Sequence, residues 1–212
     1  MRLLFIFAHL DDAEIYSGGL ISKLKSDGFE INVCCVKNNI FSCEENIIRN
    51  KEFDQSMKII GIKPDRLGFI DGEKILENDE KKLIDYINLT NPDIIITHNT
   101  NDYHFDHRDV ARVVIDSASY KYPVLMTDTL CGNDVVPSYY CDITNFMDIK
   151  KKMIRCYKSQ LLKCDYIEMV KVLNSYRFLQ YTGKTGGFCE AYSCYSLYHK
   201  FEIDSIVQSI FL

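Results

Sequence analysis

The chain has 212 residues, and its 25 Lys and Arg against 30 Asp and Glu give a formal net charge of −5. Because 47% of the residues are apolar and 26% are charged, the chain can bury a core and lacks the composition of a disordered protein. The mild negative charge disfavours a nucleic-acid-binding protein and a polybasic membrane-surface protein, since both need clustered Lys and Arg.

The N-terminal apolar run, residues 3–8, stops at His9 and a pair of acidic residues. A signal-peptide core needs about 7–15 apolar residues and a membrane span about 18 or more, so neither is predicted and we expect a cytoplasmic protein. The nine Cys include no C-x-x-C pair, which favours reduced thiols that pack as small apolar side chains. The length predicts one domain over residues 1–212.

The first half of the chain alternates strand and helix signals. Apolar runs typical of strands occur at residues 2–8, 30–36, 66–70 and 94–96. Helical spacing covers residues 15–27, 44–60, 78–90 and 107–119. This order predicts a Rossmann-like α/β fold, with a mostly parallel sheet, helices on both faces and right-handed connections.

The second half of the chain is less regular. Strands are predicted near residues 123–128 and 138–143, and helices near 145–159 and 165–180. A strand or an extended segment is predicted over residues 190–198. The Lys150-Lys151-Lys152 run is interpreted as a solvated helix face, because charge runs usually are.

Two clusters of metal-ligand side chains follow strands of the predicted sheet. One is His9-Leu10-Asp11-Asp12, and the other is His104-Phe105-Asp106-His107 in the loop after residues 94–96. Open parallel sheets bind ligands at the carboxyl ends of their strands, so we expect the clusters to share one crevice. His and carboxylate side chains suit a catalytic zinc. On the residues alone, helix capping by Asp11, Asp12 and Asp106 remains an alternative.

Both clusters also resemble the motifs of a known family. Ala8-His9-Leu10-Asp11-Asp12-Ala13-Glu14, followed by Gly18-Gly19, resembles the A-H-P-D-D-x-E…G-G signature of the LmbE-like (PIG-L) zinc-dependent N-deacetylases. His104-Phe105-Asp106-His107-Arg108 resembles the H-P-D-H motif of that family. Leu10 and Phe105 replace the prolines of the two motifs. These changes affect loop rigidity rather than ligand identity, because proline fixes φ and coordinates nothing.

The resemblance implies a reaction and a set of roles. The reaction is zinc-dependent removal of an N-acetyl group from an amino-sugar (N-acetylglucosamine-type) conjugate, which releases acetate and a free amine. The implied zinc ligands are His9, Asp12 and His107. Asp11 is implied as the general base that accepts the proton of the attacking water.

Three further roles follow from the same resemblance. His104 would stabilise or protonate the tetrahedral intermediate, Asp106 would orient His104, and Arg49 would help to hold the substrate. The implied partner is a small N-acetylated sugar conjugate, and the family is compatible with a homo-oligomer. The identity of the conjugate and the oligomeric state stay open.

Two alternatives use the same residues. One is a metal-dependent hydrolase of another amide or an ester, and the other is a non-catalytic carbohydrate-binding relative, which retention of all the ligand and base residues disfavours. A nucleotide site is disfavoured because no G-x-G-x-x-G is present. His98 could support the site, His199 is interpreted as structural or exposed, and residues 183–187 as a connector or a rim of the substrate mouth.

Overall fold

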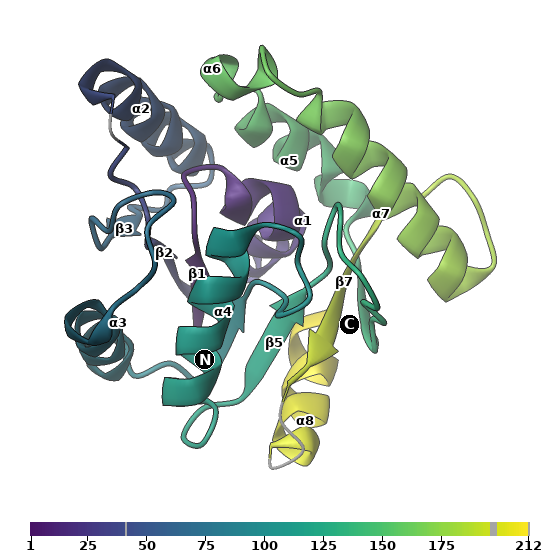
Figure 1. Ribbon diagram of the computed structural model, residues 1–212. Helices are drawn as coiled ribbons and strands as arrows, with labels where there is room; N and C mark the ends of the chain where they lie inside the picture. The colour runs from purple at the N-terminus through teal and green to yellow at the C-terminus, as the bar shows by residue number, and fades with distance from the viewer. Residues whose placement is uncertain (41, 196–198, 212) are drawn as a thin grey trace.

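The structure is a computed structural model that describes residues 1–40, 42–195 and 199–211. A sheet of seven strands lies at its centre in the order β3-β2-β1-β4-β5-β7-β6. Pairing is parallel from β3 to β5 and antiparallel where β7 and β6 extend one edge (Figure 1). The strands are β1 (Arg2–Phe7), β2 (Glu30–Cys35), β3 (Asp65–Arg66), β4 (Ile94–Thr97), β5 (Val124–Thr127), β6 (Tyr139–Asp142) and β7 (Cys189–Cys194).

Helices cover both faces of the sheet, as predicted. One core cluster joins the sheet to helices α1 (Asp12–Ser26), α2 (Cys43–Ile59), α5 (Met147–Ile154), α7 (Tyr166–Thr182) and α8 (Lys200–Phe211). The other cluster joins it to α3 (Glu77–Thr90) and α4 (Phe105–Ala118). Two short helices, η1 (Thr144–Phe146) and α6 (Lys158–Leu161), complete the described elements.

Strand β1 shows why the sequence folds in this way. Successive side chains of a strand point to opposite faces, and Leu3, Phe5 and Phe7 belong to one core cluster while Leu4 and Ile6 belong to the other. All five are at most 1% exposed. The unbroken apolar run is therefore the signature of a central strand that is buried on both faces.

Three elements differ from the sequence-based expectation. The strand predicted at 66–70 covers only Asp65–Arg66 and an isolated bridge at Ile70, because Gly68 has φ +78° and interrupts the extended backbone. The helix predicted at 145–159 is divided into η1, α5 and α6. Helix α8 was not predicted. Strand β7 covers the start of the segment predicted at 190–198, whose residues 196–198 lie outside the described residues.

Lys150 corrects the interpretation of the lysine run as a solvated face. Its side chain is fully buried, and its Nζ lies 2.7 Å from Glu190 Oε1 and 3.0 Å from Asn174 Oδ1. Glu190 also accepts the backbone N–H groups of Gly19 and Leu20, each at 2.8 Å. This network ties α5 and β7 to α1, the helix that begins at Asp12, and so helps to fix the first cluster of site residues.

Each described helix is either too short or too polar to cross a membrane.

Candidate active site

The two clusters meet because β1 and β4 are neighbours in the sheet. His9, Asp11 and Asp12 follow the carboxyl end of β1, and Asp12 begins α1. His107 lies in the first turn of α4, which follows β4. His9 Nδ1 and His107 Nε2 are 3.2 Å apart, so the structure brings residues 98 positions apart into one site.

Asp12 adds its two carboxylate oxygens to this pair of ring nitrogens. Its Oδ2 lies 3.3 Å from His9 Nδ1, and its Oδ1 lies 3.3 Å from His107 Nε2. Ligand atoms at about 2.0–2.1 Å from a tetrahedral zinc are themselves about 3.3 Å apart, so this set of two imidazoles and one carboxylate fits zinc. Three overlapping groups of described residues bring three ligand atoms within 4.8 Å of one another: His9 with His104 and His107, Asp12 with His98 and His107, and His9 with Asp71 and Asp106.

The charges around this set favour a cation. Burial lowers the pKa of His107, but Asp12 and Asp102 outweigh burial and raise it to about 9. Burial likewise opposes the charge on His9, and Asp12 together with Asp106 raises its pKa well above the usual value. The protein therefore stabilises positive charge where the ligand atoms converge.

A second layer of side chains holds His107 in place. Its Nδ1 lies 3.2 Å from Asp102 Oδ2, and its ring stacks on the buried ring of His98 with centroids 3.9 Å apart. His98 Nε2 accepts the backbone N–H of Ala8 at 2.9 Å. Burial and the neighbouring His107 lower the pKa of His98 to about 4, so His98 supports the site as a neutral ring.

Asp106 contacts His9 rather than His104 with its carboxylate. Asp106 Oδ2 lies 3.2 Å from His9 Nε2 and accepts the backbone N–H of Gly72 at 3.1 Å, whereas it is 3.9 Å from His104 Nδ1. Oδ1 of Asp106 pairs with the fully buried Lys37, which also lies 3.2 Å from Asp109 Oδ2. Burial opposes the charge of Asp106, but His9 and Lys37 lower its pKa below the usual value.

Asp11 is free of the capping role that its sequence position suggests. It occupies the N-cap position of α1 without a side-chain capping hydrogen bond. Arg49 on α2 lies 3.3 Å from Asp11 Oδ1, and Arg49 Nε has no partner among the described residues. Burial raises the pKa of Asp11, although Arg49 opposes the shift. The Asp11 carboxylate is buried and lies at the same cavity as His9, Asp12 and His107.

His104 is the most exposed histidine of the cluster, with 37% of its side chain accessible. Its ring centroid lies 4.8 Å from that of His9 and 4.6 Å from that of His107. Its Nδ1 accepts the backbone N–H of Asp106 at 3.2 Å, which caps α4. Burial, with His9 and His107, lowers the pKa of His104.

These residues lie around one cavity of about 330 Å³. The polar floor consists of His9, Asp11, Asp12, Arg49, Asp71, His104 and His107. The other lining residues are Ile15, Tyr16, Tyr103, Leu130, Cys131, Gln160, Cys164, Tyr166 and Met169. The sequence-predicted site residues therefore share one cavity, apart from Asp106, which lies behind His9.

Asp71 and Lys37 belong to the site although the two sequence motifs do not include them. Asp71 Oδ1 lies 3.1 Å from His9 Nε2, and Lys37 pairs with Asp106. Lys37 stands two residues after β2, and Asp71 follows Ile70, which pairs with Asn39 in parallel. Both residues follow the ends of strands on the cavity side. Open parallel sheets bind ligands at the carboxyl ends of their strands, so the position of these residues in the sequence is the signal that points to them.

Known proteins share this fold. The N,N′-diacetylchitobiose deacetylase of Pyrococcus horikoshii is 21% identical, with a TM-score of 0.77 over 92% of this chain and 83% of that chain. GalB, the 4-carboxy-2-hydroxymuconate hydratase of Pseudomonas putida, is 18% identical, with a TM-score of 0.78 over 92% of this chain and 96% of that one. A deacetylase of teicoplanin biosynthesis is 15% identical, with a TM-score of 0.72 over 93% of this chain and 100% of its own.

At these identities the solved structures show the fold alone, which a hydratase and deacetylases have in common. The family comparison goes further. The PIG-L family model, described as GlcNAc-PI de-N-acetylase, matches residues 4–118, which is more than half of the chain and includes both site clusters. The chain belongs to the PIG-L (LmbE-like) deacetylase family.

Proposed function

We propose that this chain is a zinc-dependent hydrolase that removes the N-acetyl group from an N-acetylglucosamine-type conjugate and releases acetate and a free amine. The observation that carries the proposal is the convergence of two imidazole nitrogens and the Asp12 carboxylate at 3.2–3.3 Å, with Asp11 beside them on the same cavity. Family membership supports the deacetylase class. We also propose that residues 1–212 act as one domain, because β6 and β7 complete the sheet that carries the site.

His9, Asp12 and His107 are the proposed zinc ligands. When bound, zinc would polarise the acetamide carbonyl and lower the pKa of water. The second nitrogen of each imidazole lies 3.2 Å from a carboxylate oxygen, that of Asp106 for His9 and that of Asp102 for His107. Such partners fix which ring nitrogen faces the metal.

Asp11 is the proposed general base. Its burial raises its pKa, which makes it a better proton acceptor than an exposed carboxylate. Arg49 holds one of its oxygens and lines the same cavity, where the substrate would lie. Arg49 is therefore the proposed substrate-binding residue.

His104 is the proposed donor to the tetrahedral intermediate. Because its Nδ1 accepts the N–H of Asp106, a neutral His104 carries its proton on Nε2. That N–H can donate to the oxygen that gains negative charge as water adds to the carbonyl. The backbone N–H of Asp106 orients His104, whereas the carboxylate of Asp106 contacts His9.

The test is an acetate-release screen over N-acetylated sugars with added zinc. We expect acetate and free amine in equal amounts, and His104→Ala should lower kcat by about 10²–10⁴-fold with a smaller effect on KM. An ester such as 4-nitrophenyl acetate, included in the screen, separates the amide from the ester alternative. Full activity after complete removal of metal would contradict the proposal.

A further inference from the structure

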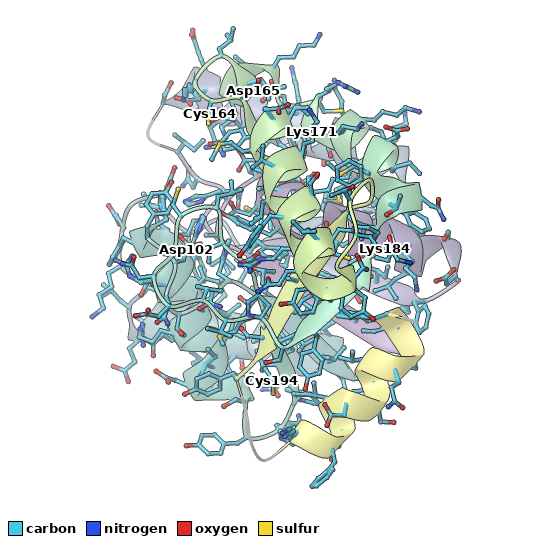
Figure 2. All side chains as sticks on the ribbon, turned by 90° about the vertical axis from the view of Figure 1, so that its right-hand side faces the viewer. Asp102, Cys164, Asp165, Lys171, Lys184 and Cys194 are labelled. Carbon is cyan, nitrogen blue, oxygen red and sulfur yellow. The ribbon has the colours of Figure 1, made fainter. Side chains whose placement is uncertain are left out.

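The cavity has a wall that the chemistry described above does not use. We call it the outer wall and define it as Leu130, Cys131, Cys164, Tyr166 and Met169. Leu130 and Cys131 lie in the connection after β5, Cys164 lies just before α7, and Tyr166 and Met169 lie in the first turn of α7. Figure 2 looks onto α7, with Cys164 and Asp165 at its N-terminal end and Lys184 beyond its opposite end.

The outer wall is uncharged and rich in apolar and sulfur atoms. Tyr166 and Met169 are three residues apart on α7 and so share a helix face. Cys164 Sγ and Met169 Sδ are 3.1 Å apart. Tyr103, which is 62% exposed, adds an aromatic ring to the same cavity. A surface of this kind gains by burying an apolar group rather than an ion.

The charged side chains that line the cavity do not favour a phosphate group either. Of the described residues that line it, Arg49 is the only Lys or Arg, and it is paired with Asp11 at 3.3 Å. Asp71 adds another carboxylate, whose side chain is 29% exposed. Proteins bind phosphate groups with Arg, Lys or free backbone N–H groups, and none of the described residues that line the cavity supplies an unpaired Lys or Arg for that purpose.

The N-terminus of α7 is also closed to an anion. This helix end adjoins the outer wall, and a helix N-terminus can bind phosphate through its free N–H groups. Here Asp165 caps the helix, and its Oδ1 accepts the backbone N–H of Glu168 at 3.1 Å. A carboxylate thus occupies the position that a phosphate would need.

We propose that the substrate is an uncharged N-acetylated amino-sugar glycoside, and that its apolar aglycone packs on the outer wall. A sugar phosphate lying against the outer wall would meet no Lys or Arg among the described residues of that wall. The proposal rests on the deacetylase function proposed above and specifies its substrate class. Met169 and Tyr166 become specificity-determining residues, because they present the aglycone-binding face of α7.

The experiment compares three substrates of the zinc-loaded enzyme by acetate release. They are 4-nitrophenyl N-acetyl-β-D-glucosaminide, free N-acetylglucosamine and N-acetylglucosamine 1-phosphate. We expect kcat/KM for the nitrophenyl glycoside to exceed that for the free sugar by at least about 10-fold, and the 1-phosphate to fall at or below the free sugar. A 1-phosphate that is better than the nitrophenyl glycoside would overturn the proposal.

A lysine introduced into the outer wall tests its role, and a lysine elsewhere on α7 is the control. Met169→Lys should lower kcat/KM for the nitrophenyl glycoside and raise it for the 1-phosphate, so that their ratio falls by about 10-fold. Val172→Lys is the control, because Val172 lies on the same helix, is 60% exposed and does not line the cavity. If both variants leave the ratio unchanged, the outer wall does not contact the aglycone.

Binding to the Asp11→Asn variant separates the two proposals. Calorimetry with the same three sugars ranks their affinities without turnover, and we expect the nitrophenyl glycoside to bind most tightly. Absence of acetate from all three sugars, with this binding order intact, would refute the deacetylase proposal and leave the substrate class standing. If acetate is released but N-acetylglucosamine 1-phosphate is preferred in both assays, the proposal of an uncharged glycoside substrate is refuted and the deacetylase proposal stands.

Discussion

Asp11 and Asp12 are adjacent in sequence and differ in their surroundings. His107 and His9 lower the pKa of Asp12 well below its usual value despite burial, whereas burial raises the pKa of Asp11. One carboxylate is thus suited to stay ionised beside a metal and the other to accept a proton.

Replacement of Asp11 tests this division. Asp11→Asn should lower kcat by at least about 100-fold, because general-base catalysis is lost, while metal analysis still finds about one zinc per chain. Asp27→Asn, at the exposed end of α1, is the control and should have no effect on either measurement. An Asp11→Asn enzyme with normal turnover would show that another group takes the proton.

Lys37 acts on the site through Asp106 and not by touching the substrate. Its buried ammonium group pairs with Asp106, whose other oxygen faces His9 Nε2. Lys37→Met should weaken zinc binding by about 10–100-fold, the usual cost of disturbing a partner of a metal ligand. Competition with a chelator measures the affinity directly, and Lys51→Met, an exposed lysine of α2, should leave it unchanged. Equal affinities for the two variants would exclude this positioning role.

At the scale of elements, α1 is held by a buried ion pair. Lys150 on α5 and Glu190 on β7 are 2.7 Å apart, and Glu190 also binds the backbone of α1. Lys150→Met should reduce the free energy of unfolding by about 3–5 kcal/mol, because it leaves a buried carboxylate without its cation. Denaturant titration measures the change. Lys151→Met, which removes only a pair with the exposed Asp148, should be close to wild type.

Periodicity predicted the elements best where one physical requirement dominates. The run from Leu3 to Phe7 is typical of a strand buried on both faces, and the position of the two clusters after neighbouring strands correctly indicated that His9 and His107 would meet. Lys150 was misjudged because sequence shows its charge but not Glu190, which is 40 residues away in the chain. The contact of Asp106 with His9 also escaped prediction, since it depends on how the loop at Gly72 folds over α4.

At the scale of the whole molecule, zinc should stabilise the fold. Its proposed ligands come from the segment that joins β1 to α1 and from α4, so bound zinc links two parts of the chain that separate on unfolding. Zinc at about 100 times its Kd should raise the Tm by about 5–10 °C, as measured by calorimetry. His9→Ala should lose most of this shift, while Asp11→Asn should keep it. A Tm that does not respond to zinc would mean that these residues do not hold the metal.

The central claim is that one zinc ion, held by His9, Asp12 and His107, is required for deacetylation by this chain. It is tested most directly by titrating zinc into the metal-free protein while acetate release is recorded with a substrate from the screen. We predict activity that starts near zero, rises in proportion to added zinc and reaches a plateau at one equivalent per chain. Full activity before any zinc is added, or a rise that shows no break at one equivalent, would contradict the claim.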